Sequence, residues 1–192
     1  MVTAADALVA QRNRVWARVG ETPGGAVDVL PFWRPRPEAD GTAGAGCLSQ
    51  FWAAPFTVDG TVFPTAEHYM MWRKATLFAD AGTARRILAA GDPAAARELG
   101  RQVRGFTEQE WTAHRFAAVL DGNLAKFGAH PELRRFLLGT GELVLVEASP
   151  ADRVWGIGLP PEHPDAGVPG RWRGQNLLGF VLMEVRDRLR AA

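Results

Sequence analysis

The sequence of 192 residues has a single cysteine, no long hydrophobic run and almost no net charge. One thiol, Cys47, excludes an internal disulfide and is typical of a reducing compartment, so we expect a cytoplasmic protein. No segment reaches the ~18 consecutive apolar residues of a membrane span, and residues 1–20 carry charges at helical spacing, unlike a signal peptide. The net charge of +1 excludes a protein held to nucleic acid mainly by neutralising phosphates.

Several common functional motifs are also missing. The four histidines are far apart and form no HExxH pair, and one cysteine cannot build a thiolate zinc site. Residues 174–179 (GQNLLG) lack the ending of a phosphate loop, and the chain has neither GxGxxG after a strand nor GxSxG. We therefore expect no metal and no cofactor. Nucleotide-hydrolysing, dinucleotide-binding and α/β-hydrolase classes have no support.

Lysine is scarce as well. Of the 22 basic residues 20 are arginine, which leaves Lys74 and Lys126 and indicates a bias toward arginine wherever either residue serves. A lysine that remains under this bias is a candidate nucleophile or base, because arginine does not lose its proton. The alternative is that the two lysines remain by chance.

Helices outnumber strands and do not alternate with them, which predicts an α+β fold: one helix-rich domain with a small β-sheet. A hairpin is expected to turn at Asp59-Gly60. In the last helix, Arg186 is expected to face solvent near the C-terminal end. Apolar spacing, caps and turn residues predict helices over 3–19, 66–78, 84–90, 93–103, 107–126, 131–138 and from 176 onward, and strands over 27–33, 56–58, 61–63 and 143–146.

The helix expected to begin after Thr65 is the first candidate for a functional site. Glu67 and Lys74 recur on one face of it, two turns apart, with Met70 and Met71 between them. Their Cα atoms would lie about 10 Å apart, enough to flank one sugar ring. A solvent-exposed pair on an amphipathic helix is the simpler alternative, although the segment is rich in large apolar residues for an outer face.

A second cluster follows the strand predicted over 143–146, where Glu147, Asp152 and Trp155 adjoin two glycines. Loops that leave a strand often carry active residues, and a tryptophan there can stack on a base. Alternatively, Asp152 caps backbone groups of a turn and Trp155 fills the core. Further on, Asn176 is first of all a helix N-cap and only secondarily an amide that binds a polar ligand.

A series of short motifs resembles the NADAR (YbiA-like) family. It departs from the family pattern at Gln50, where Asn is usual, and in a longer N-terminal segment. We therefore expect an N-terminal helix and mobile loop extension over residues 1–45 and a catalytic domain over residues 46–192. The motifs occur in order at compatible spacing: LSQFW at 48–52, PF at 55–56, DG at 59–60, EHY at 67–69, KA at 74–75, LF at 77–78, KF at 126–127, LGTG at 138–141, VE at 146–147, Asp152, WGIG at 155–158, WRG at 172–174, NLLG at 176–179 and LM at 182–183.

The resemblance implies N-glycosidase chemistry, the hydrolysis of a bond between a ribose carbon and a nitrogen. Some family members act on phosphoribosylamino-pyrimidine intermediates of riboflavin biosynthesis and release ribose 5-phosphate, so we expect an enzyme with such a small-molecule substrate. Others remove ADP-ribose from guanine in nucleic acid, which is the alternative substrate. A third hypothesis is a non-catalytic module that binds ADP-ribose or NAD, in which loss of Glu67, Lys74 or Asp152 would be expected.

For hydrolysis, the resemblance implies that Glu67, Lys74 and Asp152 are catalytic. Either carboxylate would stabilise positive charge on the ribose or activate water. The Lys74 amine would attack C1 and form a Schiff base, which requires a pKa lowered by burial and by the neighbouring Arg73. The role of Lys126 is left open: it either contacts the ligand or is structural. The expected substrate-binding residues are Trp52, His68, Trp155 and Asn176.

Overall fold

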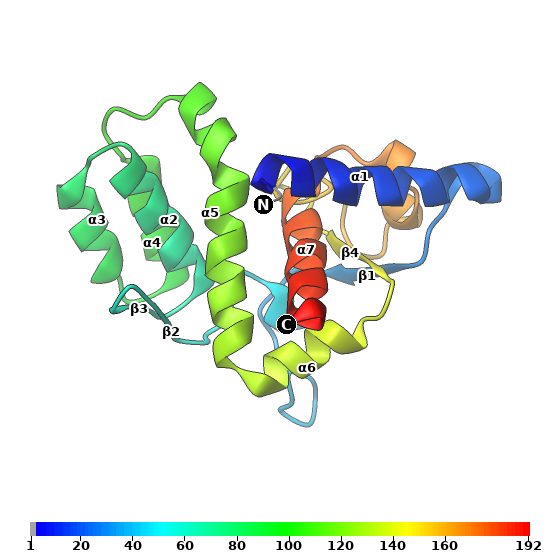
Figure 1. The fold of residues 1–192 in the computed structure, drawn as a ribbon, viewed down its shortest axis with the longest axis horizontal. Coiled ribbons are helices and arrows are strands. Elements are labelled where there is room, and N and C mark those ends of the chain that lie inside the picture. Colours follow the sequence, from blue (N-terminus) through cyan, green and yellow to red (C-terminus); the bar gives the residue numbers. More distant parts are fainter. Residues whose placement is uncertain (1–2) are drawn as a thin grey trace.

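Helix α5 (Glu108–Ala129) runs through the middle of the protein and separates two groups of elements (Figure 1). The computed structural model describes residues 3–192. One group contains α2 (Ala66–Leu77), α3 (Ala81–Leu88), α4 (Pro93–Arg101) and the hairpin of β2 (Phe56–Val58) and β3 (Thr61–Phe63). The other contains α1 (Ala4–Glu21), α6 (Pro131–Gly139), α7 (Leu177–Ala191), β1 (Val29–Phe32) and β4 (Val144–Glu147). The α+β class expected from the sequence is confirmed, with the strands arranged as two separate pairs.

Most helices begin where the sequence predicts, because polar side chains accept hydrogen bonds from backbone N–H groups that the first turn leaves unpaired. Helix α3 is the exception: it begins at Ala81, three residues before the predicted Ala84. The Asp80 carboxylate caps it by accepting a hydrogen bond from the Thr83 N–H at 3.1 Å. Caps of the same kind begin α1, α2, α4 and α5 at Thr3, Thr65, Asp92 and Thr107.

The hairpin β2–β3 turns at Asp59-Gly60, as predicted. Both residues have positive φ, 47° and 77°, the combination that gives a two-residue turn the twist of its strands. The hairpin brings Phe56 and Phe63 against Tyr69 of α2, and the Phe63 and Tyr69 rings meet edge to face with centroids 4.9 Å apart. This small aromatic core fixes the start of α2.

Strands β1 and β4 pair in parallel, with Val29 opposite Val144 and Phe32 opposite Glu147. Strand β1 thus lies within the segment 1–45, which the sequence suggested as an extension, yet it pairs with a strand of the expected catalytic domain. Helix α1 crosses α7 (Figure 1), and its buried Gln11 donates hydrogen bonds to carboxylates of α7.

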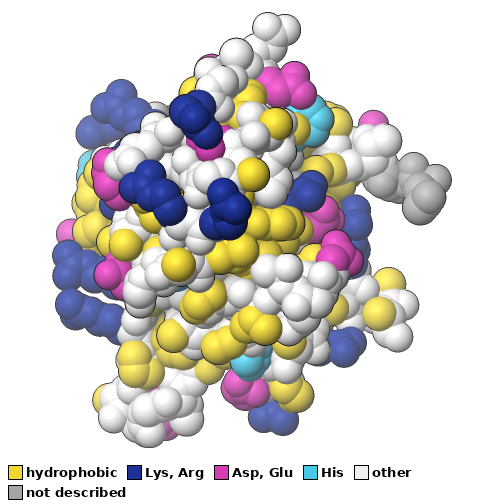
Figure 2. All heavy atoms as spheres, turned by 90° about the vertical axis from the view of Figure 1, so that its left-hand side faces the viewer, with side chains coloured by type: hydrophobic (Ala, Val, Ile, Leu, Met, Phe, Trp, Pro, Cys, Tyr) yellow, Lys and Arg dark blue, Asp and Glu magenta, His cyan; other side chains and the backbone are white. Residues whose placement is uncertain are grey.

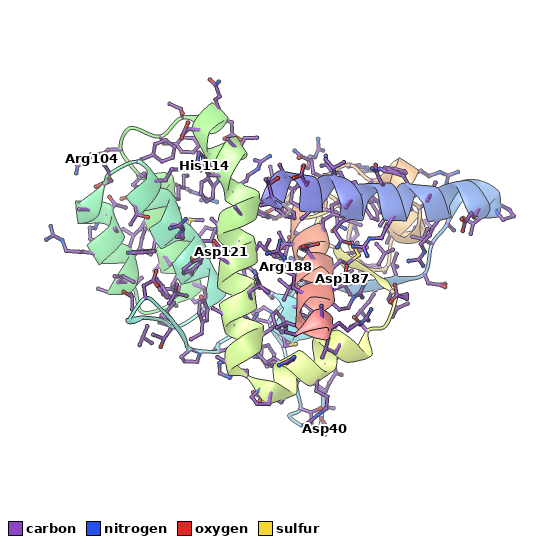
Figure 3. The ribbon with its side chains drawn as sticks, in the orientation of Figure 1. Asp40, Arg104, His114, Asp121, Asp187 and Arg188 are labelled. Carbon is purple, nitrogen blue, oxygen red and sulfur yellow. The ribbon has the colours of Figure 1, made fainter. Side chains whose placement is uncertain are left out.

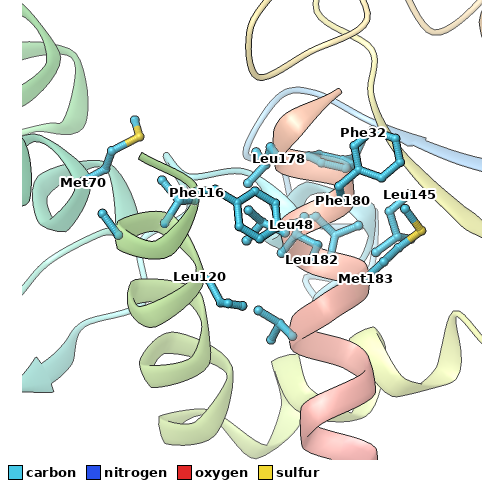
Figure 4. Close-up of a cluster of buried hydrophobic side chains, with 14 of the residues drawn as sticks. Phe32, Leu48, Met70, Phe116, Leu120, Leu145, Leu178, Phe180, Leu182 and Met183 are labelled. Atoms are coloured by element: carbon cyan, nitrogen blue, oxygen red, sulfur yellow. The ribbon is translucent and has the colours of Figure 1, made fainter. Parts of the chain in front are cut away.

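The main hydrophobic core lies where α5 and α7 face each other and β4 packs behind α7 (Figure 4). Phe116 and Leu120 of α5 pack in one cluster with Leu178 and Leu182 of α7. The prediction that Arg186 faces solvent is wrong: this residue is buried. Its guanidinium donates hydrogen bonds to the side-chain oxygen of Thr140 and the carbonyl of Leu143, so it supports the turn before β4.

The outer surface beside α3 and α4 mixes basic, acidic and hydrophobic side chains, and the basic ones are not gathered in a single patch on this face (Figure 2). Arg104, at the outer edge of this half (Figure 3), binds the Asp80 carboxylate through its backbone N–H and its guanidinium. Across residues 3–192, no helix has both the length and the apolar character needed to cross a membrane.

Candidate active site

A cavity of about 230 Å³ lies between α2, α4, the segment 49–51 and the loop that follows β4. Four of the seven residues predicted for the site line it: Glu67, Lys74, Asp152 and Trp155. The two clusters that the sequence suggested separately therefore share one cavity. Met70 and Met71 line it between Glu67 and Lys74, as the helical spacing requires.

Glu67 lies in the first turn of α2, and its backbone N–H donates a hydrogen bond to the Gln50 carbonyl at 3.0 Å. Its side chain is 3% exposed, and Oε1 has no hydrogen-bond partner among residues 3–192. Burial raises the pKa of this carboxyl to about 8; Arg97 and Arg101 act in the opposite direction, and Asp152 adds to the rise. At neutral pH the side chain is therefore a carboxylic acid, able to donate a proton.

Glu147 is a second acidic residue of the cavity, which the sequence analysis named in its second cluster but did not include among the predicted site residues. It ends β4, where its backbone N–H donates to Oδ1 of Asn176 and its carbonyl accepts from the Ile157 N–H. Oε2 is buried and has no partner within residues 3–192. Burial raises its pKa to about 8, and Asp152 and Glu67 reinforce the rise. The sequence signal that could have identified Glu147 as a site residue was its place at the end of a predicted strand.

Asp152 and Trp155 combine the two alternatives that the sequence left open. Oδ1 of Asp152 accepts hydrogen bonds from the backbone N–H groups of Val154 and Trp155, both at 2.8 Å, so it does cap a turn. Both side chains also line the cavity. The turn needs glycine at 156, because a Cβ there would lie 2.8 Å from the Glu147 carbonyl.

Lys74 borders the same cavity with its amine held at two points. Nζ donates a hydrogen bond to the Gly100 carbonyl at 2.9 Å and lies 4.0 Å from the centroid of the Phe106 ring. Burial lowers the pKa of this lysine, against a smaller opposing effect of Glu108. A larger share of neutral amine follows, which is the form that acts as a nucleophile.

Two arginines of α4, Arg97 and Arg101, line the cavity from the exposed side. They are four residues apart and so share one helix face. The guanidinium of Arg97 lies over the Phe51 ring, 5.2 Å from its centroid. Gly100 lets α4 approach α2 closely, because a Cβ there would collide with the Met71 side chain. No local signal marked these arginines, since only helix packing brings them to the cavity.

The remaining predicted residues, Trp52, His68 and Asn176, do not line the cavity. Trp52 is half-buried against the main core, and its neighbour Phe51 lines the cavity instead. His68 is buried: Nε2 donates to the Ala90 carbonyl at 3.2 Å, so Nδ1 accepts from the Thr65 hydroxyl at 2.8 Å.

Asn176 precedes α7 with a left-handed backbone (φ 53°), and its side chain does not cap the helix. Instead, Oδ1 accepts from the Glu147 N–H and Nδ2 donates to the Leu145 carbonyl. The amide therefore fixes the end of β4 and the position of Glu147 beside the cavity.

Buried polar residues of α5 support the segment that forms one wall. Lys126 is fully buried, and its Nζ donates hydrogen bonds to the carbonyls of Cys47 and Ser49 at 2.7 and 2.9 Å. Burial lowers its pKa to about 7. Asn123 accepts a hydrogen bond from the Gln50 side chain at 3.1 Å. These contacts give Lys126 a structural role, one of the two roles left open above.

The fold and the site together define an α+β domain with one cavity that combines three carboxyl groups with a lysine and two arginines. Within residues 3–192, no group of three or more His, Cys, Asp or Glu side chains is arranged to hold a metal ion. The chain belongs to the NADAR domain family, whose model matches residues 31–190, and the resemblance noted from the motifs is thus confirmed.

Comparison with individual similar proteins supports the assignment to this family. The chain is 39% identical over 150 residues to N-glycosidase R617 of Acanthamoeba polyphaga mimivirus, and this match covers 76% of the chain and 88% of that protein. It is 34% identical over 144 residues to N-glycosidase YbiA of Escherichia coli K12, covering 75% and 81%. The NMR structure of the E. coli protein YbiA superposes with a TM-score of 0.68 at 30% identity, covering 85% of this chain and 86% of that one.

Proposed function

We propose that this protein is an N-glycosidase that hydrolyses the ribose C1–N bond of a phosphoribosylamino-pyrimidine, an intermediate of riboflavin biosynthesis, and releases ribose 5-phosphate. The observation that carries the proposal is the composition of the cavity, which combines three carboxyl groups, a lysine of lowered pKa and two arginines. The names of the similar proteins support the reaction class. The choice of pyrimidine comes from the family resemblance.

Side chains that line the cavity suit the separate parts of this substrate. Arg97 and Arg101 offer guanidinium donors to the 5-phosphate, for which arginine is well shaped. Trp155, in the loop that follows β4, offers a ring on which the pyrimidine can stack. The ribose then lies between them, beside Lys74 and the carboxyl groups.

Lys74 is the nucleophile in this proposal. Its neutral amine attacks C1 of the ribose, and the C1–N bond breaks with its electron pair on the pyrimidine nitrogen, which takes a proton from an acid of the cavity and departs as an amine. The lysine nitrogen passes a proton to the Asp152 carboxylate. Glu67, a carboxylic acid at neutral pH, then protonates the ring oxygen so that the sugar opens to a Schiff base on Lys74. Water adds to C1, the C1–lysine bond breaks, and the protons return to their original groups.

The size of the cavity favours a small substrate over the alternative of ADP-ribose on guanine. The cavity measures about 230 Å³, and the ribosylated pyrimidine is much the smaller of the two candidate substrates. The net charge of +1 and the mixed surface of Figure 2 weigh against a strong electrostatic hold on a polynucleotide. A module that only binds ADP-ribose has no need for buried, unpartnered carboxyl groups, which cost free energy.

The test is to incubate the purified protein with ribosylamino-uracil 5-phosphate and to assay ribose 5-phosphate, with borohydride added to a parallel sample. We expect release of the sugar phosphate, and a protein adduct of matching mass that is lost in Lys74→Ala. If no sugar phosphate appears, ADP-ribosylated guanosine is assayed next. Inactivity on both substrates, with retained binding of ADP-ribose, would establish the binding module instead.

A further inference from the structure

Two carboxyl groups that line the cavity, one on a buried and one on a half-buried residue, each have one buried oxygen without a hydrogen-bond partner among residues 3–192: Oε1 of Glu67 and Oε2 of Glu147. A buried polar atom without a partner costs free energy, so its retention calls for an explanation. A substrate that supplies the missing partner is one. The two acids come from different elements, the start of α2 and the end of β4, and both line the cavity.

Asp152 acts on both acids, but their other charged neighbours differ. Glu67 interacts with Arg97 and Arg101, the residues that the proposed function places at the phosphate end. The charged groups that act on Glu147 are both acidic, Asp152 and Glu67. Within residues 3–192, no cation is among the groups that shift its pKa, so the surroundings of Glu147 favour its protonated form.

Glu147 is also tied through its backbone to the loop that carries Trp155. The Ile157 N–H donates to its carbonyl, which closes the loop that carries Asp152 and Trp155 back onto the end of β4. If Trp155 stacks on the pyrimidine, the base lies against the loop that begins at Glu147. Of the two acids, only Glu67 also interacts with Arg97 and Arg101, the proposed partners of the phosphate. This difference assigns the two acids to different atoms of the substrate in the proposal that follows.

We propose that Glu147 is the catalytic acid that protonates the leaving nitrogen when the C1–N bond breaks. This inference rests on the proposed N-glycosidase function. The electron pair of the broken bond goes to the pyrimidine nitrogen, which takes the proton of Glu147 and departs as a neutral amine. Glu147 is left as a carboxylate, and the water that later adds to C1 returns a proton to it.

Leaving groups of different basicity test the proposal, because a leaving group that departs as a stable anion needs no proton. The two substrates are ribosylamino-uracil 5-phosphate and 4-nitrophenyl ribofuranoside 5-phosphate. Release of the leaving group in a single turnover reports only the bond-breaking step. For Glu147→Gln we expect a loss of roughly 10²–10⁴-fold on the nitrogen-linked substrate, the usual contribution of a general acid, and less than about tenfold on the nitrophenyl substrate.

The matched control is Asp152→Asn, which removes the acceptor of the lysine proton and should slow both substrates alike. Equal losses on both substrates in Glu147→Gln would overturn the assignment of the acid. Failure of the wild-type protein to release either leaving group would overturn the proposed function and the inference together. These two failures are therefore distinguishable.

A second measurement uses only the wild-type protein, in case Glu147→Gln does not fold. Single-turnover release from the nitrogen-linked substrate should fall as pH rises through the range in which the acid loses its proton. Release of nitrophenolate should not fall over the same range. Parallel pH profiles for the two substrates would contradict the proposal.

Discussion

Replacing Glu67 by glutamine should stabilise the fold at neutral and alkaline pH while it abolishes activity. The side chain is 3% exposed, and its burial raises the pKa from 4.5 to about 8. The folded chain therefore holds a proton on Glu67 at pH values at which the unfolded chain has released it. Glutamine has nearly the same shape and no charge to desolvate, so this cost is absent in the variant.

The sign and size of the effect follow from proton linkage. Because the pKa is higher in the folded chain, the carboxyl costs no stability below pH 4.5, and stability falls as pH rises from 4.5 to about 8. The free energy of unfolding falls by about 1.4 kcal/mol per pH unit over this range. The loss of stability reaches about 3 kcal/mol at pH 7 and levels off at about 5 kcal/mol above pH 8. Comparing the same variant at different pH values cancels any constant effect of the amide.

Urea denaturation of the wild type and Glu67→Gln at half-unit steps from pH 4.5 to 9 measures this difference. We expect the advantage of the variant to grow with pH and then to level off. Glu21→Gln, at the exposed end of α1, is the control and should give a flat difference. A flat difference for Glu67→Gln as well would refute the reasoning, because it would mean that the carboxyl titrates alike in both states.

Three further predictions concern the cations of the site. Lys74→Arg should be as inactive as Lys74→Ala and should form no borohydride-trapped adduct, since arginine keeps its proton; measurable turnover in the arginine variant would reduce Lys74 to a positive charge. Arg97→Ala should raise KM about 10–100-fold for the phosphorylated substrate and little for its dephosphorylated form, because a charge-assisted hydrogen bond worth about 1.5–3 kcal/mol is lost. Steady-state kinetics measures both KM values, with Arg85→Ala as the control variant. An equal change of KM for the two forms in Arg97→Ala would contradict the reasoning. Lys126→Met should lower the free energy of unfolding in urea by about 1–3 kcal/mol, because the buried Cys47 carbonyl loses the lysine donor, and an unchanged midpoint would exclude this structural role.

The sequence by itself determined the elements whose signals act within a few residues. Thr65 begins α2 because its hydroxyl accepts a hydrogen bond from a backbone N–H three residues on. Asp59-Gly60 turns the hairpin because both residues tolerate positive φ. The placement of Glu67 and Lys74 on one face of α2 follows from helical geometry alone, and the motif series indicated the family.

The tertiary structure decided which of these residues share a cavity and which protonation state their side chains adopt. Glu147 and Arg97 reach the cavity from β4 and α4, and only the packing of those elements around α2 brings them near Glu67. Packing likewise turns Arg186 inward and directs the Asn176 amide to the backbone of β4. The raised pKa of Glu67 arises from desolvation, which depends on every segment that excludes water from the side chain, and no local pattern in the sequence specifies that.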